Sequence, residues 1–145
     1  MPVDFSRLRN PKKQMAWVAF AGPGANFVMG FGWMIAFVVL SVLPPTEMGM
    51  FFRKMAGAGV SVNAAMFVFN LIPVPPLDGG RIMTGLLPMQ LARPYASIER
   101  YSLYVFGALV LLMYTGILNR ALLAAIEFVI GIFVTLVTPL TAILT

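Results

Sequence analysis

The segment at residues 69–81 reads FNLIPVPPLDGGR, and it decides how the chain is organised. It closes a long apolar run, and it carries an amide at Asn70 and a carboxylate at Asp78. Three prolines stand between these two residues, and a proline inside a helix removes a hydrogen bond and breaks or kinks the helix. The segment therefore predicts a helix that unwinds near Pro73. Because polar groups at membrane depth are costly and usually functional, Asn70 and Asp78 are the first candidates for a site.

The composition around this segment indicates a membrane protein. Of the 145 residues, 60% are hydrophobic and 10% are charged, and the mean hydropathy is +0.91. A soluble domain carries about a quarter charged residues. The net charge of +5 comes from few residues between apolar blocks, which favours a role in membrane topology over nucleic-acid binding. The chain has no histidine and no cysteine, which excludes disulfides and thiolate metal sites.

We expect an all-α membrane protein that forms a single multi-pass domain with about four transmembrane helices. A helix needs ~20 apolar residues to cross a bilayer. The second helix is predicted to break near Pro73, and a short interfacial helix over residues 81–91 is expected after Asp78, ended by Arg93-Pro94. The domain covers residues 1–145, with a basic head at 1–14 and spans at about 15–43, 55–77, 101–118 and 121–144.

The basic residues predict the orientation, because Lys and Arg hold loops on the cytoplasmic side. With the head in the cytoplasm, four spans place the 74–100 region and the C-terminus on the same side. These segments then hold seven of the ten Lys and Arg residues. We therefore expect a multi-pass protein of the cell membrane with its N-terminus and its 74–100 region in the cytoplasm.

Two interpretations of Asp78 remain open at this point. An Asp-Gly pair favours an ordinary tight turn, whereas the nearby Asn70 and Pro73 favour a functional site. In the second interpretation, Gly79 and Gly80 give structural support, because glycine lets backbone or substrate approach closely. Farther upstream, Asn26 either satisfies backbone groups freed at a broken helix start or supports the site.

Three pieces of the sequence resemble the site-2 protease family, whose members are intramembrane zinc metalloproteases. Residues 70–81 are similar to the family's Asn-x-x-Pro…Leu-Asp-Gly signature. Residues 21–26, AGPGAN, are similar to its Ala-Gly-Pro-x-x-Asn segment. The basic stretch at residues 8–13, LRNPKK, resembles the sequence that leads into that segment in the family. The order and spacing of the pieces agree with the family, and the resemblance covers roughly residues 2–90.

The resemblance implies a zinc cofactor and roles for the matched residues. In the family the aspartate that matches Asp78 is the third zinc ligand, and Asn70 and Pro73 match the segment that binds substrate. The other two ligands are histidines of a His-Glu-x-x-His helix, whose glutamate is the general base, and this sequence lacks that helix. A catalytic zinc takes about three protein ligands. We therefore expect no complete catalytic set, no tight zinc binding and no peptide hydrolysis by this chain alone.

Two explanations of the missing helix stay open. The favoured one is that the chain is the C-terminal part of a truncated protease, and the other is a non-catalytic pseudoprotease that binds transmembrane helices. A transporter or channel subunit ranks below both, because the last two spans lack a second broken helix. The expected partners are the lipid bilayer, transmembrane substrate helices, and a missing N-terminal helix or another subunit, with no nucleic acid. The role of Glu127, inside the fourth span, stays open.

Overall fold

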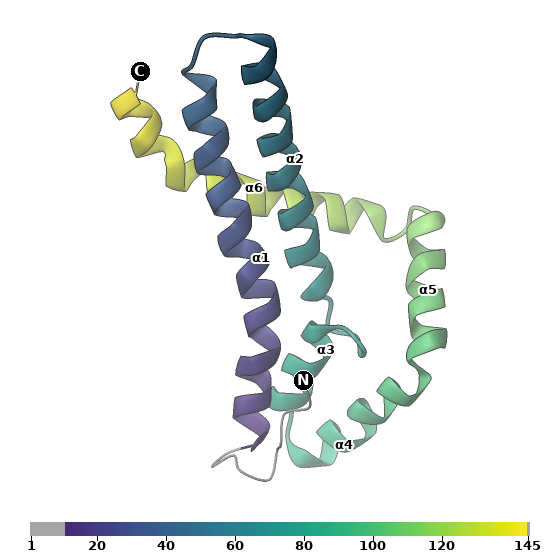
Figure 1. Ribbon diagram of the computed structural model, residues 1–145. Helices are drawn as coiled ribbons and strands as arrows, with labels where there is room; N and C mark the ends of the chain where they lie inside the picture. Colours follow the sequence, from purple (N-terminus) through teal and green to yellow (C-terminus); the bar gives the residue numbers. More distant parts are fainter. Residues whose placement is uncertain (1–10, 145) are drawn as a thin grey trace. The chain divides into compact units, whose positions relative to one another are not determined.

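The computed structural model describes residues 11–144, and these residues form helices joined by short turns, with no strand among them (Figure 1). The expected all-α class is confirmed. The helices are α1 (Pro11–Ser41), α2 (Glu47–Asn70), α3 (Asp78–Leu86), α4 (Met89–Ser97), the 3₁₀ helix η2 (Ile98–Tyr101), α5 (Ser102–Tyr114) and α6 (Asn119–Leu144). They group into two compact units. The first unit holds the chain up to Gly24 together with Phe69–Asn119, and the second holds Ala25–Val68 together with the chain from Arg120 onward.

Three of the described helical segments are long and apolar enough to cross a membrane, judged by length and composition. They are Gln14–Ser41, Met89–Tyr114 and Asn119–Leu144. Helix α2 is long enough to cross a membrane, but it is less apolar than these three segments, because Arg53 and Lys54 lie in its first half. The expected number of four spans is therefore approximate.

Helix α2 begins earlier than the hydropathy pattern predicted. The second span was expected to begin at about residue 55, whereas the structure starts the helix at Glu47. The hydroxyl of Thr46 accepts a hydrogen bond from the amide of Gly49 at 3.0 Å, so Thr46 acts as the N-cap. Glu47 follows in the first turn, where its charge complements the helix dipole. The charged residues of this region are thus part of the helix.

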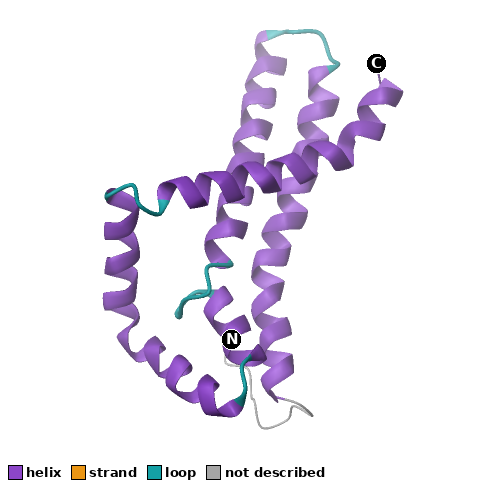
Figure 2. Ribbon diagram, turned by 180° about the vertical axis from the view of Figure 1, so that it is seen from behind, coloured by secondary structure: helices purple, strands orange, loops and turns teal. Residues whose placement is uncertain are grey.

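The second unit is a pair of neighbouring helices crossed by a third. Its parts of α1 and α2 run side by side, joined by the loop that follows Ser41, and α6 crosses them at a steep angle (Figures 1 and 2). The ring of Phe133 on α6 is fully buried at the crossing. It lies 4.9 Å from the ring of Phe27, centroid to centroid. The buried residues of this core are Met34, Val60, Ala64, Val129, Phe133 and Val137.

Small residues allow this close packing between α1 and α2. A Cβ atom built on Gly59 would stand 2.5 Å from the indole of Trp33, so the indole lies directly on the backbone of α2. The side-chain amide of Asn63 donates to the carbonyl of Gly59 in its own helix at 2.8 Å. Near the loop, Arg53 donates to the carbonyl of Leu40 at 2.9 Å and so satisfies one of the free carbonyls at the end of α1.

The prediction of one interfacial helix ended by Arg93-Pro94 was wrong. The structure forms two short helices, α3 and α4, separated at Pro88. Leu87 adopts an extended conformation (φ −66°, ψ 148°), as residues before proline prefer. Pro94 instead lies inside α4.

The end of the third predicted span also differs from its expected position. Helix α5 ends at Tyr114, and a turn precedes α6, which already begins at Asn119. Gly116 has a φ of 77° in this turn, and its amide donates to the carbonyl of Met113 at 3.1 Å. Glycine adopts this left-handed conformation without the penalty of a side chain, which is why it commonly ends helices.

Candidate functional site

The candidate site lies where α2 ends and the chain turns into α3. Asn70 is the last residue of α2, and residues 71–77 form the turn that follows (Figure 2). Inside the turn the amide of Val74 donates to the carbonyl of Ile72 at 2.7 Å, and the amide of Leu77 donates to the carbonyl of Val74 at 3.0 Å. These bonds satisfy part of the backbone that the prolines leave without helical partners. This is what a non-helical segment needs where water is scarce.

Asp78 is the first residue of α3 and is half-buried. A carboxylate in the first turn is favoured by the positive end of the helix dipole. Its side chain lies against Gly22 of α1: a Cβ atom built on Gly22 would stand 2.8 Å from Oδ2 of Asp78. The fold therefore brings together two sequence motifs that lie far apart along the chain, AGPGAN and LDGG.

Gly79 and Gly80 are buried and support the turn through their lack of side chains. A Cβ atom on Gly79 would stand 2.4 Å from the carbonyl oxygens of both Leu71 and Ile72, and one on Gly80 would stand 2.3 Å from the nitrogen of Pro75. The sequence left open whether backbone or substrate approaches these glycines. In the structure it is the backbone of the turn that approaches them.

Tyr95 of α4 also contacts this turn, and sequence reasoning missed it. Pro73 is exposed, and its carbonyl accepts a hydrogen bond from the Tyr95 hydroxyl. The two residues are separated by 22 positions, and no local pattern pairs a tyrosine in one helix with a proline carbonyl in an earlier turn. This bond ties α4 to the segment that leads into Asp78.

Arg81, one turn after Asp78, forms an ion pair with Glu99 of η2, with 2.8 Å between Nη2 and Oε1. The hydrogen bond with Glu99 raises the pKa of the Arg81 guanidinium, partial burial opposes this shift, and the charges of Glu99 and Asp78 reinforce it. Both side chains of the pair are about half exposed, at 50% and 45%. Such a pair contributes less than about 1 kcal/mol to stability, so we assign it a local orienting role.

The two asparagines predicted to belong to the site lie in different units. Asn70 is half-buried at the end of α2 in the first unit. Within residues 11–144, no hydrogen bond joins its side chain to Asp78. Asn26 is half-buried in the second unit. The broken helix start that one of the two interpretations of Asn26 required is not present, because α1 continues through Pro23.

The residues present do not fit a catalytic zinc. Within residues 11–144 there is no group of three or more His, Cys, Asp or Glu side chains that could hold a metal ion. The sequence supplies no imidazole or thiolate, and Glu99 is already paired with Arg81. A carboxylate at Asp78 supplies one donor group, whereas a catalytic zinc takes about three protein ligands.

Comparison with known proteins matches the region that contains the site. Residues 45–114 match the family model described as Peptidase family M50. A protein of Bacillus subtilis (strain 168) named "Putative zinc metalloprotease YwhC" is 30% identical over 112 residues, which is 73% of this chain. The chain spans about half of that relative's length, 50%. No solved structure matches the chain significantly.

Proposed function

Because the chain fits the site-2 protease family, peptidase family M50, we propose that it is the aspartate-bearing part of a zinc endopeptidase that cleaves peptides within the membrane. In this proposal Asp78 provides one metal ligand, and the remaining ligands and the general base come from residues outside this sequence. The chain by itself does not hold zinc tightly and does not hydrolyse peptides.

The observation that carries the proposal is the contact between Gly22 and Asp78. The two motifs that resemble the family are far apart in the sequence, yet the Asp78 carboxylate lies directly against the glycine of the first motif. The dipole of α3 and the glycines that follow Asp78 hold this carboxylate at a fixed point of the backbone. A fixed carboxylate is what a metal ligand requires, since loosely held ligands lose affinity.

We assign substrate binding to Asn70 and Pro73, which flank the irregular backbone between α2 and α3. The proposed substrates are transmembrane helices, which expose peptide groups only when they are locally unwound. We propose that the protein lies in the cell membrane, with the bilayer and either an N-terminal helix or another subunit as partners. Its N-terminus and its 74–100 region are proposed to be cytoplasmic, in line with the distribution of Lys and Arg.

The experiment that tests this proposal measures the zinc content of purified protein in detergent. The 145-residue chain is compared with a version preceded by a segment carrying the family's His-Glu-x-x-His helix, each with and without Asp78→Ala. We expect about one zinc per chain only in the longer version, and we expect Asp78→Ala to abolish it. Glu127→Gln is the matched control, because it also removes one carboxylate but lies on α6, in the second unit.

Two other outcomes would contradict the proposal in different ways. Stoichiometric zinc in the 145-residue chain would show that this chain holds zinc by itself, although Asp78 was expected to be its only zinc ligand. Absence of zinc from every version, with each version folded, would instead favour a protein that binds transmembrane helices without cutting them.

Gly22→Ala provides a second prediction at the same site. The new methyl group would meet Oδ2 of Asp78 at 2.8 Å, and the carboxylate can rotate away because it ends a flexible side chain. We expect the chain to fold normally while the zinc affinity of the longer version falls by about 10- to 100-fold, as when a group that orients a metal ligand is changed. Gly24→Ala is the control, because its Cβ would meet only the ring of Phe20 at ordinary contact distance, 3.8 Å. Equal zinc affinity in the two variants, measured by competition with a chelator, would argue against a ligand at Asp78.

A further inference from the structure

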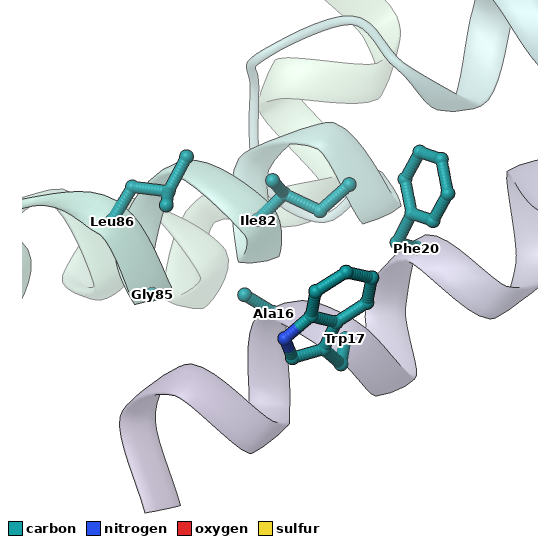
Figure 3. A pocket seen from close by; sticks show the side chains of 6 residues that line it. All are labelled: Ala16, Trp17, Phe20, Ile82, Gly85 and Leu86. Atoms are coloured by element: carbon teal, nitrogen blue, oxygen red, sulfur yellow. The ribbon is translucent and has the colours of Figure 1, made fainter.

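An apolar pocket lies in the first unit between the start of α1 and α3. Its volume is about 390 Å³, and it is lined by Ala16, Trp17, Phe20, Ile82, Gly85 and Leu86 (Figure 3). This volume falls within the range of ligand sites, roughly 300–1,000 Å³. None of the lining side chains is charged, and the only polar group among them is the indole N–H of Trp17. The pocket is therefore suited to a hydrocarbon chain.

We propose that this pocket binds one acyl chain of an anionic phospholipid, whose headgroup lies at the beginning of α1. The first argument is the position of the pocket along the helix. Ala16 and Trp17 lie in the first turns of the candidate span Gln14–Ser41. Trp17 and Leu86 remain 73% and 72% exposed, so their apolar surfaces lack cover from the described protein. A tryptophan near the end of a span is typical of the level where lipid headgroups meet acyl chains.

The second argument is charge complementarity. The sequence before the span carries four basic residues and one acid within residues 2–14: Arg7, Arg9, Lys12 and Lys13 against Asp4. A cluster of basic residues next to a transmembrane helix attracts anionic lipids. The positive end of the α1 dipole acts in the same direction. A zwitterionic lipid could use the same pocket for its acyl chain, but it would gain little from this charge.

The Asp78 carboxylate, near the Phe20 end of the pocket, determines which way the bound lipid points. Leu86 and Phe20 lie at opposite ends of the row of lining residues, with Ile82 between them (Figure 3). The Phe20 end is close to Gly22, which contacts the Asp78 carboxylate. An anionic headgroup would be repelled there, and Arg81 does not offset this because it is paired with Glu99. The headgroup is thus favoured at the start of α1 and the acyl chain toward Phe20.

The test uses the purified 145-residue chain and two photoreactive lipids. One is a phosphatidylglycerol with a diazirine in an acyl chain, and the other is a phosphatidylcholine with the same chain. Labelled peptides are identified by mass spectrometry. We expect phosphatidylglycerol to label the peptides containing Trp17 and Ile82 at least about fivefold more than phosphatidylcholine, since each basic residue near an anionic surface contributes about that factor.

Two variants separate the pocket from the charge. Ala16→Phe fills the pocket and should reduce labelling at these peptides by both lipids, whereas Gly131→Phe, on α6 in the second unit, should not. The double variant Lys12→Gln/Lys13→Gln should bring phosphatidylglycerol labelling close to the level of phosphatidylcholine. It leaves the lining of the pocket intact, so it remains informative if Ala16→Phe fails to fold.

Three results would overturn the proposal. Equal labelling by the two lipids in the unmodified chain would mean that the pocket holds ordinary bilayer lipid without selection. Labelling confined to other helices would mean that no acyl chain enters it. Efficient cross-linking of a photoreactive residue at position 17 to a second copy of the chain, at the expense of lipid, would mean that a protein helix covers the pocket.

Discussion

Replacing Gly79 by alanine is expected to destabilise the folded chain by about 3 kcal/mol, the upper part of the usual range for overpacking. The added Cβ would lie 2.4 Å from the carbonyl oxygens of Leu71 and Ile72. These are backbone atoms, so no side-chain rotation can relieve the clash, and the turn must separate from α3. Gly80→Ala should behave similarly, because its Cβ would lie 2.3 Å from the nitrogen of Pro75. Unfolding by SDS in mixed micelles, followed by circular dichroism, measures the loss.

Gly107→Ala is the matched control, and its effect should have the opposite sign. Gly107 also lies inside a helix of the first unit, α5, but a Cβ atom there would meet nothing within 4 Å. Helix propensity favours alanine over glycine by about 1 kcal/mol, so Gly107→Ala should be neutral or stabilising. If Gly79→Ala and Gly107→Ala changed stability equally, the backbone of the turn would not rest on α3, and the position of Asp78 would need another explanation.

The break at the end of α2 could be predicted from the sequence because its cause is local. Three prolines within residues 73–76 cannot continue a helix, and α2 ends at Asn70 for that reason. The division between α3 and α4 could not be predicted from the sequence in the same way. Pro88 and Pro94 look alike as helix breakers, yet only Pro88 separates two helices. A local rule ranks both prolines equally, and the packing of the surrounding chain makes the difference.

The contacts that build the candidate site depend on tertiary structure. The motif containing Gly22 was recognised in the sequence, but its contact with Asp78 follows only from the packing of α1 against α3. The bond from Tyr95 to Pro73 was missed for the same reason. Local patterns thus identified Asp78 and its glycines, whereas the neighbours that hold Asp78 in place required the fold.

The second large effect is expected at Phe133, the buried ring at the centre of the second unit. Phe133→Ala should cost about 3–5 kcal/mol, the usual range for removing a buried aromatic ring. The ring is 0% exposed and packs against Phe27 and Phe31, with centroid distances of 4.9 and 6.3 Å. In a membrane, lipid can replace apolar contacts at a helix surface but cannot enter a cavity of this size without opening the helices. Most of the loss is therefore a loss of packing, and the same unfolding titration measures it.

Phe128→Ala is the matched control for Phe133→Ala, because it is the same substitution on the same helix at an exposed position. Phe128 lies on the same helix and is 72% exposed, so its removal makes the same change in helix propensity but leaves no cavity. We expect it to change stability by less than about 0.5 kcal/mol, as surface substitutions usually do. An equal loss in the two variants would mean that the α6 crossing does not stabilise the unit.

A double variant tests whether Phe133 acts through the crossing itself. A Cβ atom on Gly30 of α1 would stand 2.9 Å from the Phe133 ring, so Gly30→Ala alone should overpack the core. In the Phe133→Ala background the ring is absent, and the new methyl group would occupy part of the space that it leaves. Because the two positions are in contact, their effects should not add, and coupling between contacting residues is typically about 0.5–3 kcal/mol. Gly30→Ala should therefore be less harmful, or even stabilising, when Phe133 is alanine. Strictly additive losses would place the two residues too far apart to interact and would contradict the packing of α6 on α1.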